Sequence, residues 1–151
     1  MPATDDPRST ALRLLARRDF SRGELRTRLS RQASEASAAV QGIEATLDDL
    51  ESDGQLSDER FVEGFVRSRL HRGQGPLRIR HDLRARGVDA DVLDRHLTFS
   101  TEFWIERVVA IRQRRFGEAL PASAAERGRQ ARFLAQRGFP SDVIFAAFKA
   151  G

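Results

Sequence analysis

The sequence predicts an all-α protein, arranged as an elongated, curved array of three tandem three-helix repeats. Three observations predict this class. Apolar residues recur at helical spacing, and no segment sustains the period-two alternation of a half-buried strand. Helix-capping residues and glycine stops divide the chain at short intervals. One stretch, comprising a helix end, a glycine and the next helix start, returns 51 residues later.

The first repeat is expected over residues 9–53. Ser21 and Glu24 have the spacing of a capping box, which predicts that a helix begins here. A second helix follows and ends at Gly54, because glycine readily adopts the left-handed conformation of a helix stop. The apolar residues of these two helices are Leu25, Leu29, Val40, Ile43, Leu47 and Leu50.

The second repeat is expected over residues 57–98. Ser57 is typical of a helix N-cap, Pro76 of a first helical position, and Gly87 of a helix stop. One broad apolar face lies between Ser57 and Pro76 and predicts a buried helix. Its residues are Phe61, Val62, Phe65, Val66 and Leu70.

The third repeat is expected over residues 101–149, and within it a helix over 123–137 ends at Gly138. Its first helix carries Trp104, which we expect in the core. The pattern L-x-x-R-G-φ-x-x-D-V-φ, where φ is apolar, occurs at residues 83–93 and again at 134–144. The apolar residues of the first helix are Phe103, Trp104, Val108, Val109 and Ile111.

Repeats of this size have too little apolar surface to close a core alone, so each should stack on its neighbour. Residues 1–8 are expected to form a flexible N-terminus before the first repeat. Stacked helical arrays present extended surfaces, which serve binding more often than catalysis. We therefore expect a binding protein. The expected oligomeric state is a monomer.

Charge is unevenly distributed along the chain. Residues 1–60 carry 9 basic and 12 acidic side chains, a net charge of −3, whereas residues 61–151 carry 17 basic and 10 acidic, a net charge of +7. This asymmetry favours a polyanion or an acidic protein surface as partner. The alternative is a solvated face in a protein that uses arginine where others use lysine.

Composition excludes several classes of protein. The chain contains no cysteine, so disulfides and thiolate metal sites are excluded. No stretch approaches the roughly 18 apolar residues of a membrane span, and the acidic N-terminus lacks the apolar core of a signal peptide. The expected location is the cytoplasm, without a membrane partner.

The segment Asp49–Arg60 resembles a calcium-binding loop, with acidic residues at positions 1, 3 and 5 and glycine at position 6. The bidentate glutamate required at position 12 is replaced by Arg60, a cation. Glu59 lies one residue early, and one residue turns a helical side chain by about 100°. We therefore interpret this segment as a helix stop followed by a cap, with no metal.

Other motifs also lack the chemistry that they suggest. Gly73-Gln-Gly75-Pro76 has neither the third glycine of a dinucleotide fingerprint nor the lysine of a phosphate loop. His81 and Asp82 are neighbours, so on a helix their side chains diverge by about 100°. No zinc motif or serine elbow is present. We expect no enzyme and no cofactor.

Arginines are the better candidates for function, because the planar guanidinium donates two hydrogen bonds at once to a phosphate or carboxylate. The residues expected to meet a protein partner or DNA are Arg67, Arg69, Arg72, Arg78, Arg80, Arg84, Arg112, Arg114 and Arg115. On a helix that begins at Pro76, Arg80 and Arg84 share one flank. Aromatic residues lie mostly at core spacing, so bases should not be read by stacking.

Three motifs resemble, in order and spacing, the successive signatures of the RecX regulatory protein family. They are Phe20-Ser-Arg-Gly-Glu-Leu25, Gly54-Gln-Leu-Ser-Asp-Glu-Arg-Phe61, and Gly75-Pro-Leu-Arg-Ile79 with Leu83 and Arg86-Gly-Val88. The resemblance covers roughly residues 10–148. The first repeat departs from it at Ala33–Ser37, where the Arg-Gly stop of the later repeats is missing.

The resemblance implies a cytoplasmic bacterial regulator of the RecA recombinase, active in DNA repair, homologous recombination and the SOS response. Members of this family lodge in the groove of the RecA–DNA filament and inhibit its ATPase, strand exchange and coprotease activities. Some also bind single- or double-stranded DNA. Two alternatives remain: a direct DNA-binding module with basic three-helix units, and a scaffold for an acidic protein without nucleic acid.

Overall fold

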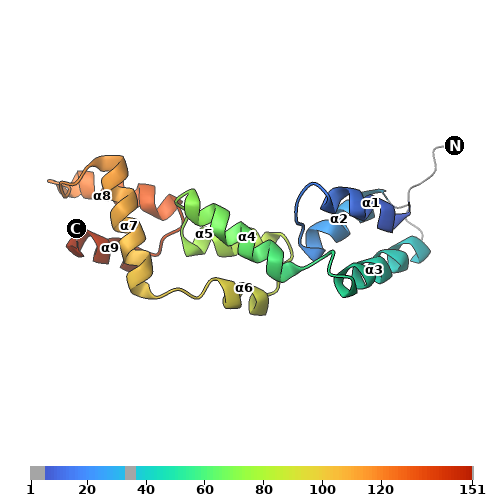
Figure 1. Ribbon diagram of the computed structural model, residues 1–151. Helices are drawn as coiled ribbons and strands as arrows, with labels where there is room; N and C mark the ends of the chain where they lie inside the picture. Colours follow the sequence, from blue (N-terminus) through green and yellow to red (C-terminus); the bar gives the residue numbers. More distant parts are fainter. Residues whose placement is uncertain (1–5, 33–36, 151) are drawn as a thin grey trace. The chain divides into compact units, whose positions relative to one another are not determined.

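The computed structural model describes residues 6–32 and 37–150, without the side chains of residues 37–41. These residues form nine α-helices and no strand, so the all-α class is confirmed (Figure 1). The helices are α1 (Pro7–Leu15), α2 (Arg22–Gln32), α3 (Ser37–Ser52), α4 (Asp58–His71), α5 (Pro76–Ala85), α6 (Ala90–His96), α7 (Thr101–Phe116), α8 (Ala124–Gln136) and α9 (Ser141–Ala150). Residues 33–36, where the first repeat lacks the Arg-Gly pattern, and the Val40 side chain lie outside the described residues.

The chain forms two compact units. Unit 1 comprises Met1–Gly64 and Leu83–Leu93, and unit 2 comprises Phe65–Asp82 and Asp94–Gly151. Each unit thus combines helices from two successive predicted repeats, and the three-repeat division itself stays a prediction. Helix α1 begins at Pro7, two residues before the predicted first repeat. None of the helices in the described ranges is both long and apolar enough to cross a membrane.

The predicted helix caps are present. In the capping box, the Glu24 amide donates to Ser21 Oγ at 3.0 Å, and the Ser21 amide donates to Glu24 Oε1 at 3.2 Å. Ser57 Oγ likewise accepts the backbone N–H three residues on, at 3.1 Å. Ser123, which the sequence placed at the start of a helix, is a further cap with the same contact at 3.1 Å. These bonds satisfy amides that have no partner within a helix, which is why these helices begin where they do.

The predicted glycine stops are also present, at Gly54, Gly87 and Gly138. Their φ angles are 75°, 79° and 99°, in the region that disfavours a side chain. At all three, the next residue donates its amide to the carbonyl of the leucine five positions earlier, at 2.9, 3.2 and 3.3 Å. This pattern is the Schellman motif, which closes the last turn of a helix.

The core of unit 1 lies between α1, α2 and α3. Its buried residues are Ala11, Phe20, Leu25, Leu29, Ile43, Leu47, Leu50 and Leu56. Leu25 and Leu29 stand one turn apart and form the buried face of α2, as the sequence predicts. Full burial of a leucine or isoleucine contributes roughly 1.5–3 kcal/mol, so these side chains hold the three helices together.

The core of unit 2 lies where α7 packs against α8 and α9. Trp104 is 6% exposed, as expected for a core residue, and meets the Phe139 ring edge-on with centroids 6.2 Å apart. The other buried residues of these three helices and their junctions include Val108, Leu134, Val143, Ile144, Ala147 and Phe148. Because the chain has a single tryptophan, Trp104 fluorescence reports on unit 2 alone.

An end-to-end contact joins the start of α5 to the end of α8 within unit 2. The Gly75 amide donates to the Arg137 carbonyl at 2.7 Å, and the Leu77 amide donates to the Gly138 carbonyl at 2.9 Å. Free amides at a helix start carry partial positive charge, and carbonyls at a helix end carry partial negative charge. The amides that have no partner at the start of α5 are therefore satisfied by the carbonyls that have no partner at the end of α8.

Unit 1 contains a related contact between α2 and the end of α5. Ser21 Oγ donates to the Arg86 carbonyl at 2.7 Å. A Cβ added at Gly23 would lie 2.7 Å from the Arg86 oxygen and 2.9 Å from the Gly87 Cα, so only glycine allows this approach. Gly23 is the second residue of α2 and Gly75 directly precedes α5, so both glycines lie at the start of the second helix of their repeats. Arg86 and Arg137 occupy the same position of the repeated L-x-x-R-G pattern.

A cluster of ion pairs joins α2 to α3 on the surface of unit 1. The Arg22 guanidinium donates to Glu44, Asp48 and Glu51 at 2.8–2.9 Å. Arg26 donates to Glu44 through Nε at 2.5 Å. Hydrogen bonds from Arg26 and Arg22 lower the pKa of Glu44 to about 2. Arg22 and Arg26 of unit 1 are therefore held by acidic residues of the same fold and are not free for a partner.

The Gly75→Ala variant is expected to lose roughly 2 kcal/mol or more of unit 2 stability. A Cβ at this position would lie 2.6 Å from the carbonyl carbon and oxygen of Gly138, and backbone overlap cannot be relieved by a rotamer change. Urea unfolding followed by Trp104 fluorescence measures the loss. Gly128→Ala in α8 is the control, because its nearest neighbour is the flexible end of Arg132 and a helical alanine gains roughly 0.5–1 kcal/mol. Equal midpoints for Gly75→Ala and the wild type would contradict the contact.

The Glu44→Gln variant is expected to lose about 1 kcal/mol at neutral pH, since solvent screens a pair this exposed. The folded-state pKa of Glu44 lies below its ordinary value of 4.5, so its contribution is present above that value. It disappears as pH falls from 4.5 to about 2. The free energies of unfolding of Glu44→Gln and the wild type should therefore become equal as pH falls through this range. Urea unfolding followed by circular dichroism measures both, with Asp49→Asn on the same helix as the control. A difference that persists below pH 2 would assign the loss to packing.

Candidate functional site

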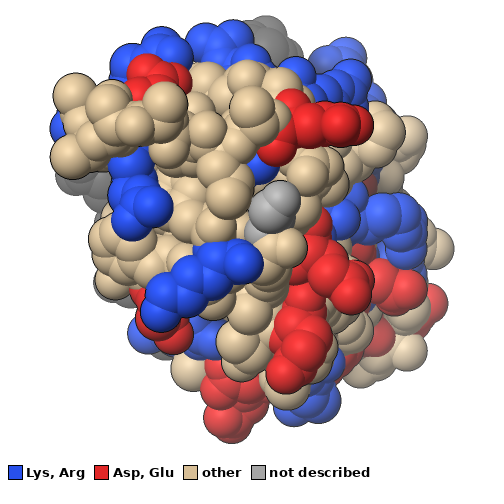
Figure 2. All heavy atoms as spheres, turned by 90° about the vertical axis from the view of Figure 1, so that its left-hand side faces the viewer, with Lys and Arg blue, Asp and Glu red and all other residues tan. Residues whose placement is uncertain are grey.

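The nine predicted arginines differ in what their guanidinium groups already bind. A guanidinium has five N–H donors, and those held by the fold are not free for a partner. On the face drawn in Figure 2, basic side chains are interspersed with acidic and uncharged ones, so charge by itself outlines no continuous binding face there. The contacts of each arginine therefore decide its role.

Arg112 does not belong to a binding surface, which corrects the prediction from sequence. Its side chain is fully buried in unit 2. The guanidinium donates to the carbonyls of Gly117, Glu118 and Ala119 at 3.1–3.5 Å, and thereby holds the loop that follows α7. A buried guanidinium suits this place because the three loop carbonyls accept hydrogen bonds that water can no longer supply.

Three further predicted arginines have internal partners. Arg69 is half-buried and donates to Asp82 at 2.7 Å within unit 2. Arg80 is exposed and pairs with Asp94 at 3.0 Å, also within unit 2. Arg84, in unit 1, donates to the Val88 carbonyl at 3.4 Å. Exposed pairs of this kind contribute roughly 0–1 kcal/mol, so Arg80 can exchange its partner at little cost.

The remaining five predicted arginines, Arg67, Arg72, Arg78, Arg114 and Arg115, are exposed. Arg115 lies over the Phe133 ring, 5.3 Å from its centroid. Arg72, Arg78 and Arg114 form no ion pair with any described residue. They are the predicted residues with the most donors left for a partner.

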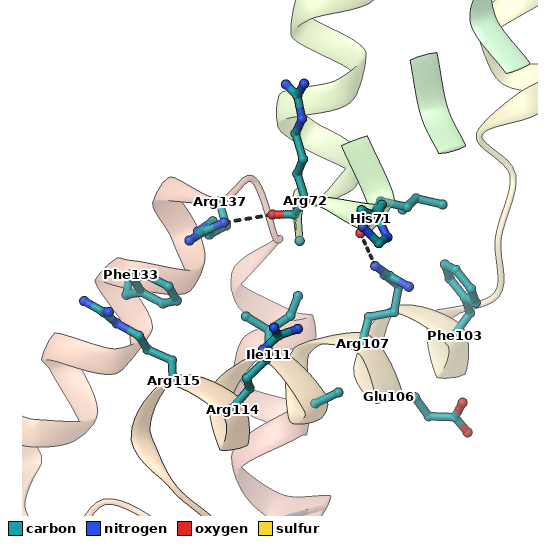
Figure 3. A pocket seen from close by; sticks show the side chains of 13 residues that line it. His71, Arg72, Phe103, Glu106, Arg107, Ile111, Arg114, Arg115, Phe133 and Arg137 are labelled. Atoms are coloured by element: carbon teal, nitrogen blue, oxygen red, sulfur yellow. Dashed lines mark hydrogen bonds between the residues drawn. The ribbon is translucent and has the colours of Figure 1, made fainter. Parts of the chain in front are cut away.

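Unit 2 contains a hollow of about 760 Å³ that brings three predicted arginines together (Figure 3). We name it the α4–α7–α8 hollow, because its lining comes from Leu70–Gly73, from α7 between Phe103 and Arg115, and from Phe133 and Arg137 of α8 and its end. Arg72, Arg114 and Arg115 line it, whereas Arg67, Arg69, Arg78, Arg80, Arg84 and Arg112 do not.

Two arginines of the hollow were missed by sequence reasoning. Arg107 donates to the Leu70 carbonyl, and Arg137 donates to the Arg72 carbonyl at 2.9 Å, so both bind the C-terminal end of α4 (Figure 3). Arg107 stands four and seven residues before Ile111 and Arg114, a spacing that places all three on one face of α7. That spacing is the signal that could have found it.

The hollow is rich in donors and poor in acceptors. Glu106 is the one acidic residue of its lining, and Figure 3 shows its carboxylate directed away from the centre. None of the five lining arginines forms an ion pair within the described ranges. The Nε of Arg107 is buried and has no acceptor among the described residues. The Arg72 guanidinium also points away from the centre in Figure 3, so it lies at the margin.

Unit 1 has a smaller hollow of about 440 Å³ beside α2. Its lining includes Arg26, Arg28 and Arg31, together with Arg18 and Arg86. Glu24 pairs with the last two at 3.3 and 3.6 Å, and Arg26 pairs with Glu44. Internal carboxylates therefore neutralise more of this hollow than of the one in unit 2.

The motifs that resemble metal and catalytic sites have other contacts. In the calcium-like segment, Glu51 accepts from Arg22 and Asp53 accepts from Arg8, each at 2.8 Å. Asp82 pairs with Arg69. Across residues 6–32 and 37–150, no three histidine or acidic side chains converge as a metal site would require.

Comparison with family models gives two matches. Residues 57–97 match the model described as RecX, second three-helix domain, and residues 102–148 match the model described as RecX, third three-helix domain. Among curated proteins, the Regulatory protein RecX of Halorhodospira halophila is 44% identical over 148 residues, which cover 98% of this chain and 89% of that protein. The protein of the same name from Pseudomonas syringae pv. tomato is 43% identical, over 95% of this chain and 93% of its own.

Comparison with solved structures supports the fold. The crystal structure of RecX from Lactobacillus salivarius has a TM-score of 0.79 at 19% identity, and the match covers 97% of this chain and 95% of that one. A second crystal structure, of a regulatory protein RecX, has a TM-score of 0.76 at 21% identity, over 99% of this chain and 74% of that one. At these identities the likeness concerns the fold alone.

The Arg112→Met variant is expected to lose roughly 1–3 kcal/mol of unit 2 stability, because three loop carbonyls lose their donor. Arg114→Met, two residues on and exposed, is expected to stay within roughly 0.5 kcal/mol of the wild type. Urea unfolding followed by Trp104 fluorescence compares the two variants. Equal stability of Arg112→Met and Arg114→Met would contradict a structural role for Arg112.

Proposed function

The chain belongs to the RecX family of regulatory proteins, and from this premise we propose that it is a negative regulator of the RecA recombinase. It binds in the groove of the RecA–DNA filament and inhibits the ATPase, strand exchange and coprotease activities of RecA. It acts in the cytoplasm as a monomer and without a cofactor. The family is one of regulatory proteins and not of enzymes, so regulation comes from binding.

The mechanism is occlusion of the filament groove, in which arginines meet acidic groove residues or DNA phosphates. The observation that carries this proposal is the set of guanidinium groups in unit 2 that the fold leaves without a carboxylate. Arg72, Arg78 and Arg114 are exposed and have no ion pair with a described residue. Such groups retain their full bidentate capacity for carboxylate or phosphate.

Direct DNA binding is the second candidate function. Helix α5 favours it, because Arg78, Arg80 and Arg84 are all exposed on one short helix. Basic helices of three-helix units suit the grooves of duplex DNA. The nine predicted arginines are proposed contacts under either candidate, except Arg112, whose burial removes it.

Single-strand-dependent ATP hydrolysis by RecA tests the first candidate. We expect the rate to fall as the protein is added, at stoichiometries up to that of the filament protomers. The double variant Arg80→Glu/Arg84→Glu should lose inhibition and keep its helical circular dichroism. Its control is Arg17→Glu/Arg132→Glu, which makes the same charge change at two exposed arginines outside the predicted set.

Absence of inhibition by the wild type would overturn the first candidate. Full inhibition by Arg80→Glu/Arg84→Glu would place the contact elsewhere on the chain. Binding to DNA without RecA, measured over a series of salt concentrations, separates the second candidate. Phosphate-driven binding weakens with log affinity linear in log salt concentration.

A further inference from the structure

We propose that the α4–α7–α8 hollow binds a short acidic segment of a partner protein, with one apolar side chain on its floor and flanking carboxylates paired with the surrounding arginines. The proposal rests on the proposed function in so far as the partner is a protein. It adds a site, and it adds the chemistry of the segment that enters the site.

The charge of the hollow selects an anionic ligand. Five arginines and a single glutamate line it, and the glutamate is directed away (Figure 3). Elsewhere in the described chain, arginines such as Arg22 and Arg26 are neutralised by carboxylates of the same fold. Here the neutralising carboxylates are missing from the described residues, and a partner can supply them.

The donors are held in place before a ligand arrives. Arg107 and Arg137 are anchored to backbone carbonyls at the end of α4. Each uses only part of its five N–H groups in this way, and the arginine side chain loses little further freedom when the rest bind. Arg114 has no such anchor and stands one turn beyond Ile111 on the same face of α7, where it can close on a carboxylate.

The floor of the hollow is apolar. Ile111 of α7 lies among Arg107, Arg114 and Arg137 in Figure 3, and Ala110 and Leu70 also line the hollow. Ile111 is only partly buried, so an apolar side chain placed on it would remove further apolar surface from water. A ligand made only of phosphates would leave this surface uncovered. The segment that fits therefore has a leucine-like residue between acidic ones.

The aromatic rings argue against single-stranded nucleic acid. Base stacking needs a free ring face. Arg115 and Arg137 both lie over Phe133, at 5.3 and 4.9 Å from its centroid. Phe103 is stacked on Phe99 with centroids 4.4 Å apart, and Arg107 lies 5.7 Å from its centroid. These contacts occupy the rings, so a protein segment is the better occupant.

Fluorescence polarisation with a labelled peptide mixture tests the site in the absence of RecA. The peptides carry two acidic residues on each side of a central leucine, isoleucine, methionine or phenylalanine. We expect saturable binding that weakens by about tenfold or more in Arg114→Glu, because the variant replaces a donor by a repelling carboxylate. Arg132→Glu, on α8 but outside the lining, is the matched control and should change affinity less than about twofold.

Further peptides separate an acidic segment from other anions. A central serine should weaken binding, because the floor then stays uncovered, and lysine in place of the acidic residues should abolish it. The proposal is overturned if the peptide mixture does not bind, or if Arg132→Glu loses as much peptide affinity as Arg114→Glu. It is also overturned if the central residue does not change the affinity and duplex DNA displaces the peptide. If the protein inhibits RecA but does not bind the peptides, the hollow is rejected as a binding site and the proposed function stands. If the protein binds the peptides but does not inhibit RecA, the proposed function is rejected and the binding site stands.

Discussion

The end-to-end contact between the start of α5 and the end of α8 is the interaction on which the rest of unit 2 depends. Two backbone hydrogen bonds at 2.7 and 2.9 Å make it, and they form only because Gly75 and Gly138 lack a Cβ. The contact brings the preceding helix end, Leu70–Gly73, beside α7 and α8. The side chains of Arg107 and Arg137 then reach one carbonyl in the last turn of α4 and one directly after it. The hollow is thus a consequence of how two helix ends satisfy each other.

The related contact in unit 1 shows how a repeated pattern acquires different chemistry. Arg86 and Arg137 occupy the same position before a glycine stop. Arg86 lies 3.6 Å from the Glu24 carboxylate, so its charge is shared with an internal acid. Arg137 donates to a backbone carbonyl and lies over Phe133, and it keeps its net charge. The fold therefore concentrates available positive charge in unit 2, although both units are rich in arginine.

This division matters for regulation by binding. A protein that regulates by binding acts through the surface that it presents. Exposed ion pairs contribute little free energy, so arginines in such pairs form a first class that can still turn to a partner. Arginines whose guanidinium groups bind backbone carbonyls, such as Arg107 and Arg137, form a second class. They stabilise helix ends and still have N–H donors for a partner's carboxylate. Arg112 belongs to a third class, because burial and three carbonyl contacts withdraw it. A count of basic residues in the sequence does not distinguish these three classes.

The sequence by itself determined the fold class, the caps at Ser21 and Ser57, and the glycine stops, because these depend on residues three to five positions apart. It also identified most of the core, since apolar spacing marks the buried face of a helix. Only the tertiary structure decided which arginines remain available. The partners of Arg112, Arg107 and Arg137 are backbone carbonyls, which carry no residue-specific signal, and Arg107 and Arg137 find theirs 37 and 65 residues away.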